Sequence, residues 1–194
     1  MSPDARTIWD AEAASFDDEP DHGLRDPATR AAWLALLTAH LPEPPARIAD
    51  LGCGTGTLSV LLADAGYAVD GVDFSPEMVT RARGKAAGRD GVTFAVGDAS
   101  EPPLEHGAYD TVLSRHVLWA LPDQPAALAR WIRLLGPRGR LVLVEGFWHT
   151  GTGLTAAQTE ALLRRAGREP STYALDNPVL WGGPITDERY LVVG

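Results

Sequence analysis

Two hydrophobic patterns alternate along most of the chain. Short apolar runs of the kind that form buried strands are followed by segments whose apolar residues recur at helical spacing. This alternation predicts a mostly parallel sheet with helices on both faces. The expected strands are 47–51, 68–72, 92–96, 109–114 and 140–145, and the expected helices are 57–65, 76–83, 124–135 and 155–166.

The end of the chain departs from this alternation. Two further strand-like runs, 171–175 and 188–193, are separated by a stretch with two prolines and the pair Gly182-Gly183. Because no helical crossover lies between them, we expect the last strand to run antiparallel. The predicted fold class is α/β, with a doubly wound, seven-stranded, mostly parallel sheet.

The N-terminal region is acidic and then helical. Residues 1–30 carry eight acidic and three basic side chains and few aliphatic ones, which indicates a segment appended to the core. Asp26 and Pro27 suit the N-cap and first residue of a helix that continues to Leu41, where Pro42 begins a proline-rich linker. We therefore divide the chain into an N-terminal helical segment, 1–41, and a core, 42–194.

Composition narrows the range of functions. With 194 residues, 45% hydrophobic and 22% charged, the chain is typical of one globular domain. Its net charge of −9 disfavours nucleic acid and anionic membranes as partners, and the sequence shows neither a signal peptide nor an apolar run long enough to span a bilayer. The single cysteine, Cys53, allows no internal disulfide and no cysteine-cluster metal site. These features predict a cytoplasmic protein without a metal centre.

A glycine-rich turn stands between the first strand and its helix. Asp50 precedes Gly52, Gly54 and Gly56. Glycines let a backbone approach a ligand closely, and the following helix offers free N–H groups. The G-x-G-x-G spacing differs from the G-x-G-x-x-G fingerprint of dinucleotide sites, which disfavours a nicotinamide-dependent oxidoreductase.

Segment 48–56 resembles motif I of the class I S-adenosylmethionine-dependent methyltransferases, in particular the small-molecule enzymes of types 11 and 25. This resemblance implies a Rossmann-like sheet, S-adenosylmethionine as cofactor and S-adenosylhomocysteine as product. It also implies that the three glycines wrap the methionine part of the cofactor, with Asp50 and Cys53 in the same turn. Asp73, at the end of the second strand, would hold the ribose hydroxyls.

Two later segments extend the resemblance, which covers roughly residues 47–193. In the family, the acid after the third strand meets the adenine amino group and the next N–H meets a ring nitrogen. Here these roles fall to Asp98 and Ala99, with Phe74 and Met78 as walls of the purine site. The loop that begins at Ser114 and Arg115 would reach the methionine end, usually through backbone carbonyls.

Four titratable residues are candidates for catalysis. Methyl transfer is a direct displacement, so alignment can supply much of the rate and a base is optional. His116, Glu145 and His149 follow or end strands where open α/β sheets bind ligands, and His22 lies in the N-terminal segment. A histidine suits proton removal from a phenol, amine or activated carbon. The alternative for each residue is a structural role in a loop or cap.

The six tryptophans are expected to divide between core and site. Trp33 and Trp131 lie on amphipathic helices and are expected in the core. The others fall on expected loops or on the N-terminal segment, where aromatic faces would favour flat rings and cations, and the acidic segment would attract an amine. The segment also resembles the N-terminal lid of many small-molecule methyltransferases. The expected substrate-contacting residues are Trp9, Phe16, Trp119, Trp148 and Trp181.

The leading hypothesis is a methyltransferase that acts on a small organic acceptor, for which aromatic and amine-bearing molecules are the candidates. A catalytically silent cofactor-binding partner or sensor on the same fold is the main alternative. An aminopropyl transferase on this fold would usually bring more carboxylates to the pocket.

Overall fold

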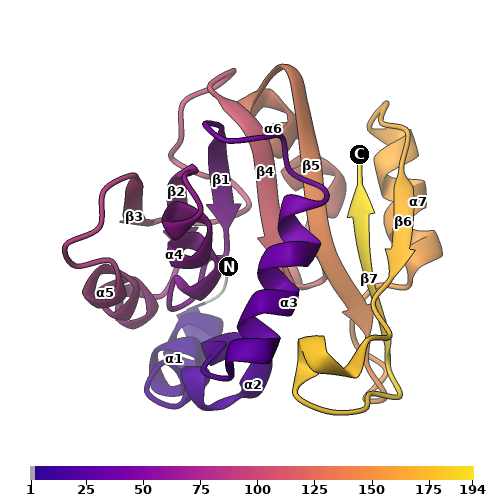
Figure 1. Ribbon diagram of the computed structural model, residues 1–194. Coiled ribbons are helices and arrows are strands. Elements are labelled where there is room, and N and C mark those ends of the chain that lie inside the picture. The colour runs from indigo at the N-terminus through magenta and orange to yellow at the C-terminus, as the bar shows by residue number, and fades with distance from the viewer. Residues whose placement is uncertain (1–2) are drawn as a thin grey trace.

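The molecule is organised around one seven-stranded sheet (Figure 1). The computed structural model describes residues 3–194. Its strands are β1 (Arg47–Leu51), β2 (Ala68–Asp73), β3 (Val92–Val96), β4 (Tyr109–Arg115), β5 (Leu135–Phe147), β6 (Ser171–Ala174) and β7 (Glu188–Val193). Their order is β3-β2-β1-β4-β5-β7-β6, and β7 alone of these runs antiparallel to its neighbours β5 and β6. The predicted α/β class and antiparallel last strand are confirmed.

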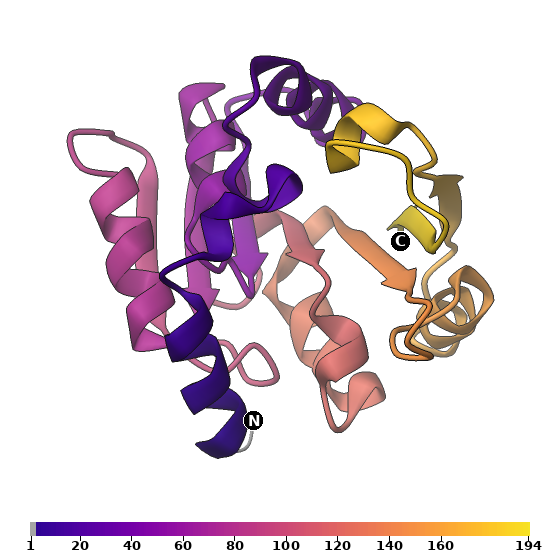
Figure 2. The ribbon, with the colours of Figure 1, turned by 90° about the horizontal axis from the view of Figure 1, so that it is seen from below.

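Helices cover both faces of the sheet (Figure 2). The helical elements are α1 (Pro3–Glu12), η1 (Phe16–Asp18), α2 (Pro20–Gly23), α3 (Pro27–Thr38), α4 (Thr57–Asp64), α5 (Pro76–Lys85), η2 (Leu118–Ala120), α6 (Gln124–Leu134), α7 (Ala156–Arg165) and η3 (Pro178–Trp181). Apolar side chains of α3, α4 and η3 pack on one face, and those of α6 and α7 pack on the other. This two-sided cover explains why the strands are continuous apolar runs.

Helix α3 begins where the sequence predicts and ends earlier. The Asp26 carboxylate accepts the Thr29 N–H at 2.8 Å, which confirms the N-cap. The helix ends at Thr38, so the expected extension to Leu41 is wrong, although Leu41 is still buried in the core. Trp33 is fully buried, as predicted.

The N-terminal segment is more than an appendage. Leu24 and Thr29 are each 2% exposed, so the expectation that residues 1–30 lie outside the core is wrong at these positions. Helix α1 contacts α5, and α2 contacts η3, where a Cβ on Gly182 would collide with Pro20. In Figure 1, α1 and α2 lie at the end of the sheet toward which the β1, β4 and β5 arrows point. The division at residue 41 stays a prediction.

Helix lengths bear on membrane association. Among residues 3–194, no helix combines the length and the apolar character that crossing a bilayer requires.

Candidate active site

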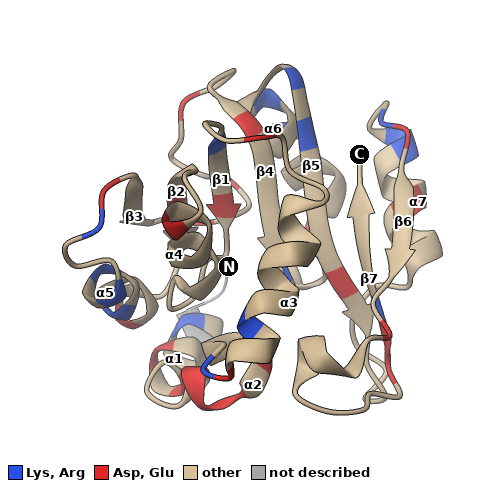
Figure 3. Ribbon diagram, viewed as in Figure 1, with Lys and Arg blue, Asp and Glu red and all other residues tan. Residues whose placement is uncertain are grey.

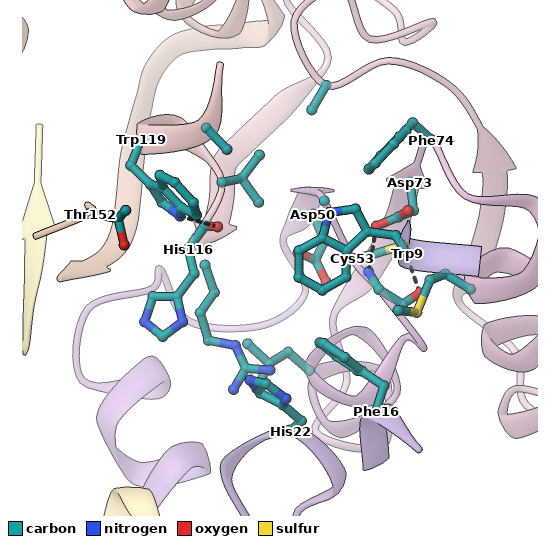
Figure 4. A pocket seen from close by; sticks show the side chains of 18 of the residues that line it. Trp9, Phe16, His22, Asp50, Cys53, Asp73, Phe74, His116, Trp119 and Thr152 are labelled. Atoms are coloured by element: carbon teal, nitrogen blue, oxygen red, sulfur yellow. Dashed lines mark hydrogen bonds between the residues drawn. The ribbon is translucent and has the colours of Figure 1, made fainter. Parts of the chain in front are cut away.

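A cavity of about 400 Å³ opens at the carboxyl ends of β1, β2 and β4, beneath the N-terminal segment. This volume lies within the range of about 300–1,000 Å³ that is common for small-molecule sites. Figure 4 shows Asp73 and Phe74 at one end and Trp119 and Thr152 at the other. Fifteen of the predicted site residues line the cavity: Trp9, Phe16, His22, Asp50, Gly52, Cys53, Gly54, Asp73, Phe74, Met78, Ala99, Arg115, His116, Trp119 and Trp148.

The glycine turn is shaped by contacts that exclude side chains. Gly52 and Gly56 have φ values of +74° and +76°, in the left-handed region that favours glycine. A Cβ at Gly52 would collide with Val117, and one at Gly56 would lie 2.7 Å from Phe94 Cζ. Gly56 itself does not line the cavity, so its part is to shape the turn.

Asp73 is fixed by backbone N–H groups on both carboxylate oxygens. Its Oδ2 accepts from Gly54 and its Oδ1 from Ser75, each at 2.9 Å. Burial raises the pKa of Asp73, and these N–H groups oppose that rise. An ionised carboxylate has about four acceptor positions, so positions remain for a ligand in the cavity.

Asp50 is buried beneath the glycine turn, and Cys53 is partly exposed within it. Burial raises the pKa of Asp50 to about 6, although the Ser59 hydroxyl donates to its carboxylate at 2.5 Å. Burial, Asp50 and Asp73 together raise the pKa of the Cys53 thiol well above its usual value. Cys53 is therefore a neutral thiol in the turn.

The residues expected around the adenine ring and in the loop at the methionine end line the cavity only in part. Phe74, Met78 and Ala99 line the cavity, but Asp98 and Ser114 do not. Asp98 accepts the Ser100 N–H at 2.8 Å, and the Ser114 hydroxyl donates to Leu51 O at 3.1 Å. Neither residue lines the cavity, and the adenine contact of Asp98 and the backbone role of the loop at Ser114 stay predictions.

Trp131 is linked to the site in a way that the sequence did not indicate. It is buried in the core, as expected, but its indole N–H also donates to Ala99 O at 2.7 Å. That bond ties the loop after β3 to α6. An N–H on an otherwise apolar helix face was the available signal, since a buried indole usually finds an acceptor.

His116 stands in the cavity wall in an unusual conformation. Its φ of +59° lies in the left-handed region, which is strained for a residue with a Cβ. Its Nε2 atom is buried and has no hydrogen-bond partner among the described residues. Burial, followed by the nearby charges of Arg115 and Arg189, lowers the pKa of His116 well below its usual value. The imidazole is therefore neutral at pH 7, and its protonated form is disfavoured.

The other three catalytic candidates lie in different surroundings. His22 lines the cavity and stacks on Phe16 with ring centroids 4.1 Å apart, and burial lowers its pKa. Glu145 is fully buried and lies behind the cavity wall, where its Oε1 accepts the Val117 and Leu118 N–H groups. His149 points away, with a side chain that is 78% exposed beside Asp187. The structure thus corrects the expectation that Glu145 and His149 face the cavity.

Aromatic rings form a chamber around His116. The rings of Trp148 and His116 meet edge to face at 5.2 Å, and Trp119 lies 5.4 Å from Trp148. The Trp119 indole N–H donates to His116 O at 2.9 Å. Trp181 does not line the cavity, because it packs against Trp33 in the core, which corrects its predicted substrate contact.

Arg189 was also missed by sequence reasoning. Its guanidinium lies 4.9 Å from the Trp148 ring centroid and 5.5 Å from that of Trp181, behind the chamber. It also pairs with Asp187 at 3.2 Å. A strand arginine carries no sequence signal for such stacking, because Trp148 is far from it along the chain.

Acidic residues attach the N-terminal segment to the core, and Figure 3 shows how densely they occur near α1 and α2. Asp10 accepts from the Ser75 hydroxyl at 2.5 Å. Asp17 pairs with Lys85 at 2.8 Å and accepts from the Thr55 hydroxyl at 2.6 Å. Asp10 and Asp17 are therefore bound to the core, whereas Glu12, Asp18 and Glu19 stay exposed.

Comparisons with known proteins agree with this geometry. A family model described as a methyltransferase domain matches residues 49–143. A demethylmenaquinone methyltransferase of Renibacterium salmoninarum is 30% identical over 177 residues, which cover 84% of this chain and 73% of that protein. The chain spans about half the length of other curated relatives, including 44% of a trans-aconitate 2-methyltransferase of Streptomyces coelicolor that is 39% identical over 134 residues.

Solved structures show the same fold. Magnesium protoporphyrin IX methyltransferase of Synechocystis, with bound S-adenosylmethionine, is 27% identical with a TM-score of 0.67, and the match covers 85% of this chain and 77% of that one. A Burkholderia thailandensis 1,6-didemethyltoxoflavin-N1-methyltransferase, with bound 1,6-didemethyltoxoflavin and S-adenosylhomocysteine, has a TM-score of 0.71 at 24% identity. That match covers 100% of this chain and 89% of the other.

Proposed function

Because this chain belongs to the class I S-adenosylmethionine-dependent methyltransferases, we propose that it transfers a methyl group from S-adenosylmethionine to a small organic acceptor with a flat aromatic ring. One observation carries the proposal. A single cavity joins the family's glycine turn and the Asp73 carboxylate to an aromatic chamber around His116.

The residues present fit the cofactor of this family. Asp73 keeps acceptor positions for two vicinal hydroxyls, and Phe74 and Met78 offer apolar walls for a purine. A Cβ at Gly52 would collide with Val117, so this position of the turn accommodates only glycine. When bound, S-adenosylmethionine supplies an electrophilic methyl group on a sulfonium.

His116 is the proposed proton acceptor. Its buried Nε2 is unpartnered, so a neutral ring can offer its lone pair to the proton that an acceptor hydroxyl or amine releases. Burial and the charges of Arg115 and Arg189 lower the pKa of His116, which makes it a weak base that would hold the proton only briefly. Trp119 and Trp148 would hold the acceptor ring and exclude water from the chamber.

An aromatic acceptor is favoured over a cationic amine. The charged groups near His116 include Arg115 and Arg189, which oppose a second positive charge. Two of the acids in the segment expected to attract an amine are engaged elsewhere, Asp10 with Ser75 and Asp17 with Lys85. The acceptor is therefore proposed to bind through its ring.

Calorimetric titration with S-adenosylmethionine and S-adenosylhomocysteine, with NADH as the control ligand, tests the cofactor. We expect both sulfur nucleosides to bind and NADH to give no heat. Asp73→Asn should weaken binding by about 1–3 kcal/mol, since it removes charge-assisted hydrogen bonds. An unchanged affinity in this variant would remove Asp73 from the ribose role.

Methyl uptake from labelled cofactor by a panel of aromatic acceptors tests the reaction. His116→Asn should lower turnover and leave the affinity for S-adenosylhomocysteine nearly unchanged. Wild-type turnover in this variant would reduce His116 to a loop residue. Cofactor binding without methyl uptake by any acceptor would favour the catalytically silent alternative.

A further inference from the structure

The aromatic chamber around His116 has no carboxylate in its wall among the residues that the structure describes. Two acidic side chains line the cavity, Asp50 and Asp73, and Figure 4 places both away from Trp119. Glu145 lies behind the wall, but burial raises its pKa to about 8, so it is protonated and uncharged at neutral pH. The negative charges of the cavity therefore lie toward the glycine turn.

Two buried arginines lie close to this chamber. Arg115 lines the cavity beside His116, and its Nη1 donates to a backbone carbonyl of α2 at 2.5 Å. Arg189 lies behind Trp148, with its guanidinium 4.9 Å from the ring centroid and a side chain that is 10% exposed. It pairs with Asp187 at 3.2 Å, but its buried Nε has no hydrogen-bond partner among the described residues. Both positive charges lower the pKa of His116, so both act on the chamber.

A positive chamber with a weak base restricts the choice of acceptor. A hydroxyl must lose its proton before or during methyl transfer, and His116 holds a proton poorly. An acidic hydroxyl needs little help from a base, and nearby cations stabilise its anion. We propose that the chamber selects an acceptor with an acidic hydroxyl on its ring, such as an electron-poor phenol or a cyclic enol, and binds it as the oxyanion. This inference rests on the methyltransferase function proposed above.

Bonds and charges balance in the transfer step that this inference implies. The acceptor oxygen forms a bond to the methyl carbon while the carbon–sulfur bond breaks and its electron pair stays on sulfur. A sulfonium and an oxyanion become a thioether and an ether, so no proton is left to remove at this step. Opposite charges attract each other more strongly where water is excluded, and the rings of Trp119 and Trp148 exclude it here. Arg189 is then a specificity-determining residue that acts through its charge.

Two pairs of flat rings test this selection. 4-Hydroxycoumarin and 2,4-dinitrophenol carry hydroxyls that are ionised at about pH 7, and a methyl group replaces the hydroxyl in 4-methylcoumarin and 2,4-dinitrotoluene. Each compound is titrated by calorimetry into protein saturated with S-adenosylhomocysteine. We expect the ionised ring of at least one pair to bind about tenfold or more tightly than its methyl partner, as charge-assisted contacts allow.

Variants of one ion pair should shift this preference in opposite directions. Arg189→Met should lower it about threefold, because the positive charge behind Trp148 is lost. Asp187→Asn should raise it by a similar factor, since Arg189 then keeps its charge without the paired carboxylate. Arg47→Met is the matched control, because Arg47 also stacks on a ring and pairs with an aspartate, but at the amino end of β1. It should keep the wild-type preference, and thermal unfolding shows that each variant is folded.

The outcomes separate this inference from the proposed function. If neither pair shows a preference for the ionised ring, the acidic acceptor is wrong while the methyltransferase function stands. A preference that is the same in the wild type, Arg189→Met and Asp187→Asn contradicts the role of Arg189. If the wild-type protein binds neither S-adenosylmethionine nor S-adenosylhomocysteine, the proposed function itself is wrong.

Discussion

Glu145 shows how a single carboxyl group can stabilise a site without entering it. Its Oε1 accepts the Leu118 N–H at 2.8 Å and the Val117 N–H at 3.2 Å. These bonds hold the backbone directly after His116, whose left-handed φ needs support from its surroundings. Burial raises the pKa of Glu145 to about 8 and keeps the group protonated at neutral pH.

Glu145→Gln is expected to change the pH dependence of stability. The pKa of Glu145 is raised in the folded state, from 4.5 to about 8, so the folded chain holds this proton more tightly than the unfolded chain. The free energy of unfolding of the wild type should therefore fall through this range as the pH rises, and the contribution of Glu145 should then level off. Gln keeps an acceptor oxygen and does not titrate.

Urea unfolding at about pH 5 and about pH 8 measures the effect. Relative to the wild type, the Gln variant should gain about 2 kcal/mol or more at the higher pH. Glu160→Gln is the control, because Glu160 is a surface residue of α7 that pairs with Arg164. A difference between Glu145→Gln and the wild type that does not change with pH would contradict the raised pKa.

At the residue scale, local motifs were predictable and long-range contacts were not. The N-cap at Asp26 and the glycine turn are properties of a few consecutive residues, so the sequence contains them. His149 was expected to face the ligand, but it turns outward to Asp187, which lies 38 residues away along the chain. The same holds for Arg189, because its tryptophan partners come from the loop after β5 and from η3.

Element η1 is fastened to the glycine turn by the chain's one lysine. Lys85, at the end of α5, donates to Asp17 at 2.8 Å, to Thr55 at 2.8 Å and to Thr57 at 2.5 Å. This cluster joins three elements around the start of α4. Its members are separated by up to 68 residues along the chain, so no local pattern indicates it.

Breaking this cluster should weaken ligand binding more than folding. Lys85→Met and Asp17→Asn should each lower the affinity for S-adenosylhomocysteine, because the segment that carries Phe16 would no longer be held against Gly54. The double variant should lose little more than either single one, with a coupling of about 1 kcal/mol. Calorimetric titration of the wild type, the two single variants and the double variant with S-adenosylhomocysteine completes this double-mutant cycle.

The ion pair between Arg25 and Asp18 offers a control in the same segment. It spans 2.9 Å, but both side chains are more than 60% exposed. Arg25→Met should therefore leave the affinity within experimental error. Additive losses from Lys85→Met and Asp17→Asn would show that the two residues act separately.

The sequence pattern predicted the presence of the helices and strands better than it predicted where each one begins and ends. All seven strands and the helices of the core occur where the hydrophobic periods place them. Strand β5, expected over 140–145, runs from Leu135 to Phe147, because pairing with β4 at one end and β7 at the other extends it. Such extension depends on partners that a single-strand pattern does not contain.

At the scale of the whole molecule, one sheet serves both folding and function. The core clusters on its two faces draw on β1, β4, β5 and β7, whereas the cavity opens at the ends of its parallel strands. The N-terminal segment closes that end, and its buried residue Leu24 belongs to the core cluster on the α3 face. We therefore expect the residues up to about 23 to close the cavity, and the residues from Leu24 onward to be those that folding requires.

Deletion of residues 1–23 tests this separation. The shortened chain keeps Leu24, the Asp26 cap and the whole sheet, so cooperative unfolding should persist with a modest loss of stability. Binding of S-adenosylhomocysteine should fall at least about tenfold, because Phe16, His22 and the Asp21 carbonyl that holds Arg115 are removed together. Circular dichroism melting and calorimetric titration report the two properties independently.

A second deletion, of residues 1–12, removes Trp9 and Asp10 but keeps η1 and α2, and it should lose less affinity. A shortened chain that no longer unfolds cooperatively would show that the segment is part of the core, and one that binds as tightly as the full chain would show that it does not close the site.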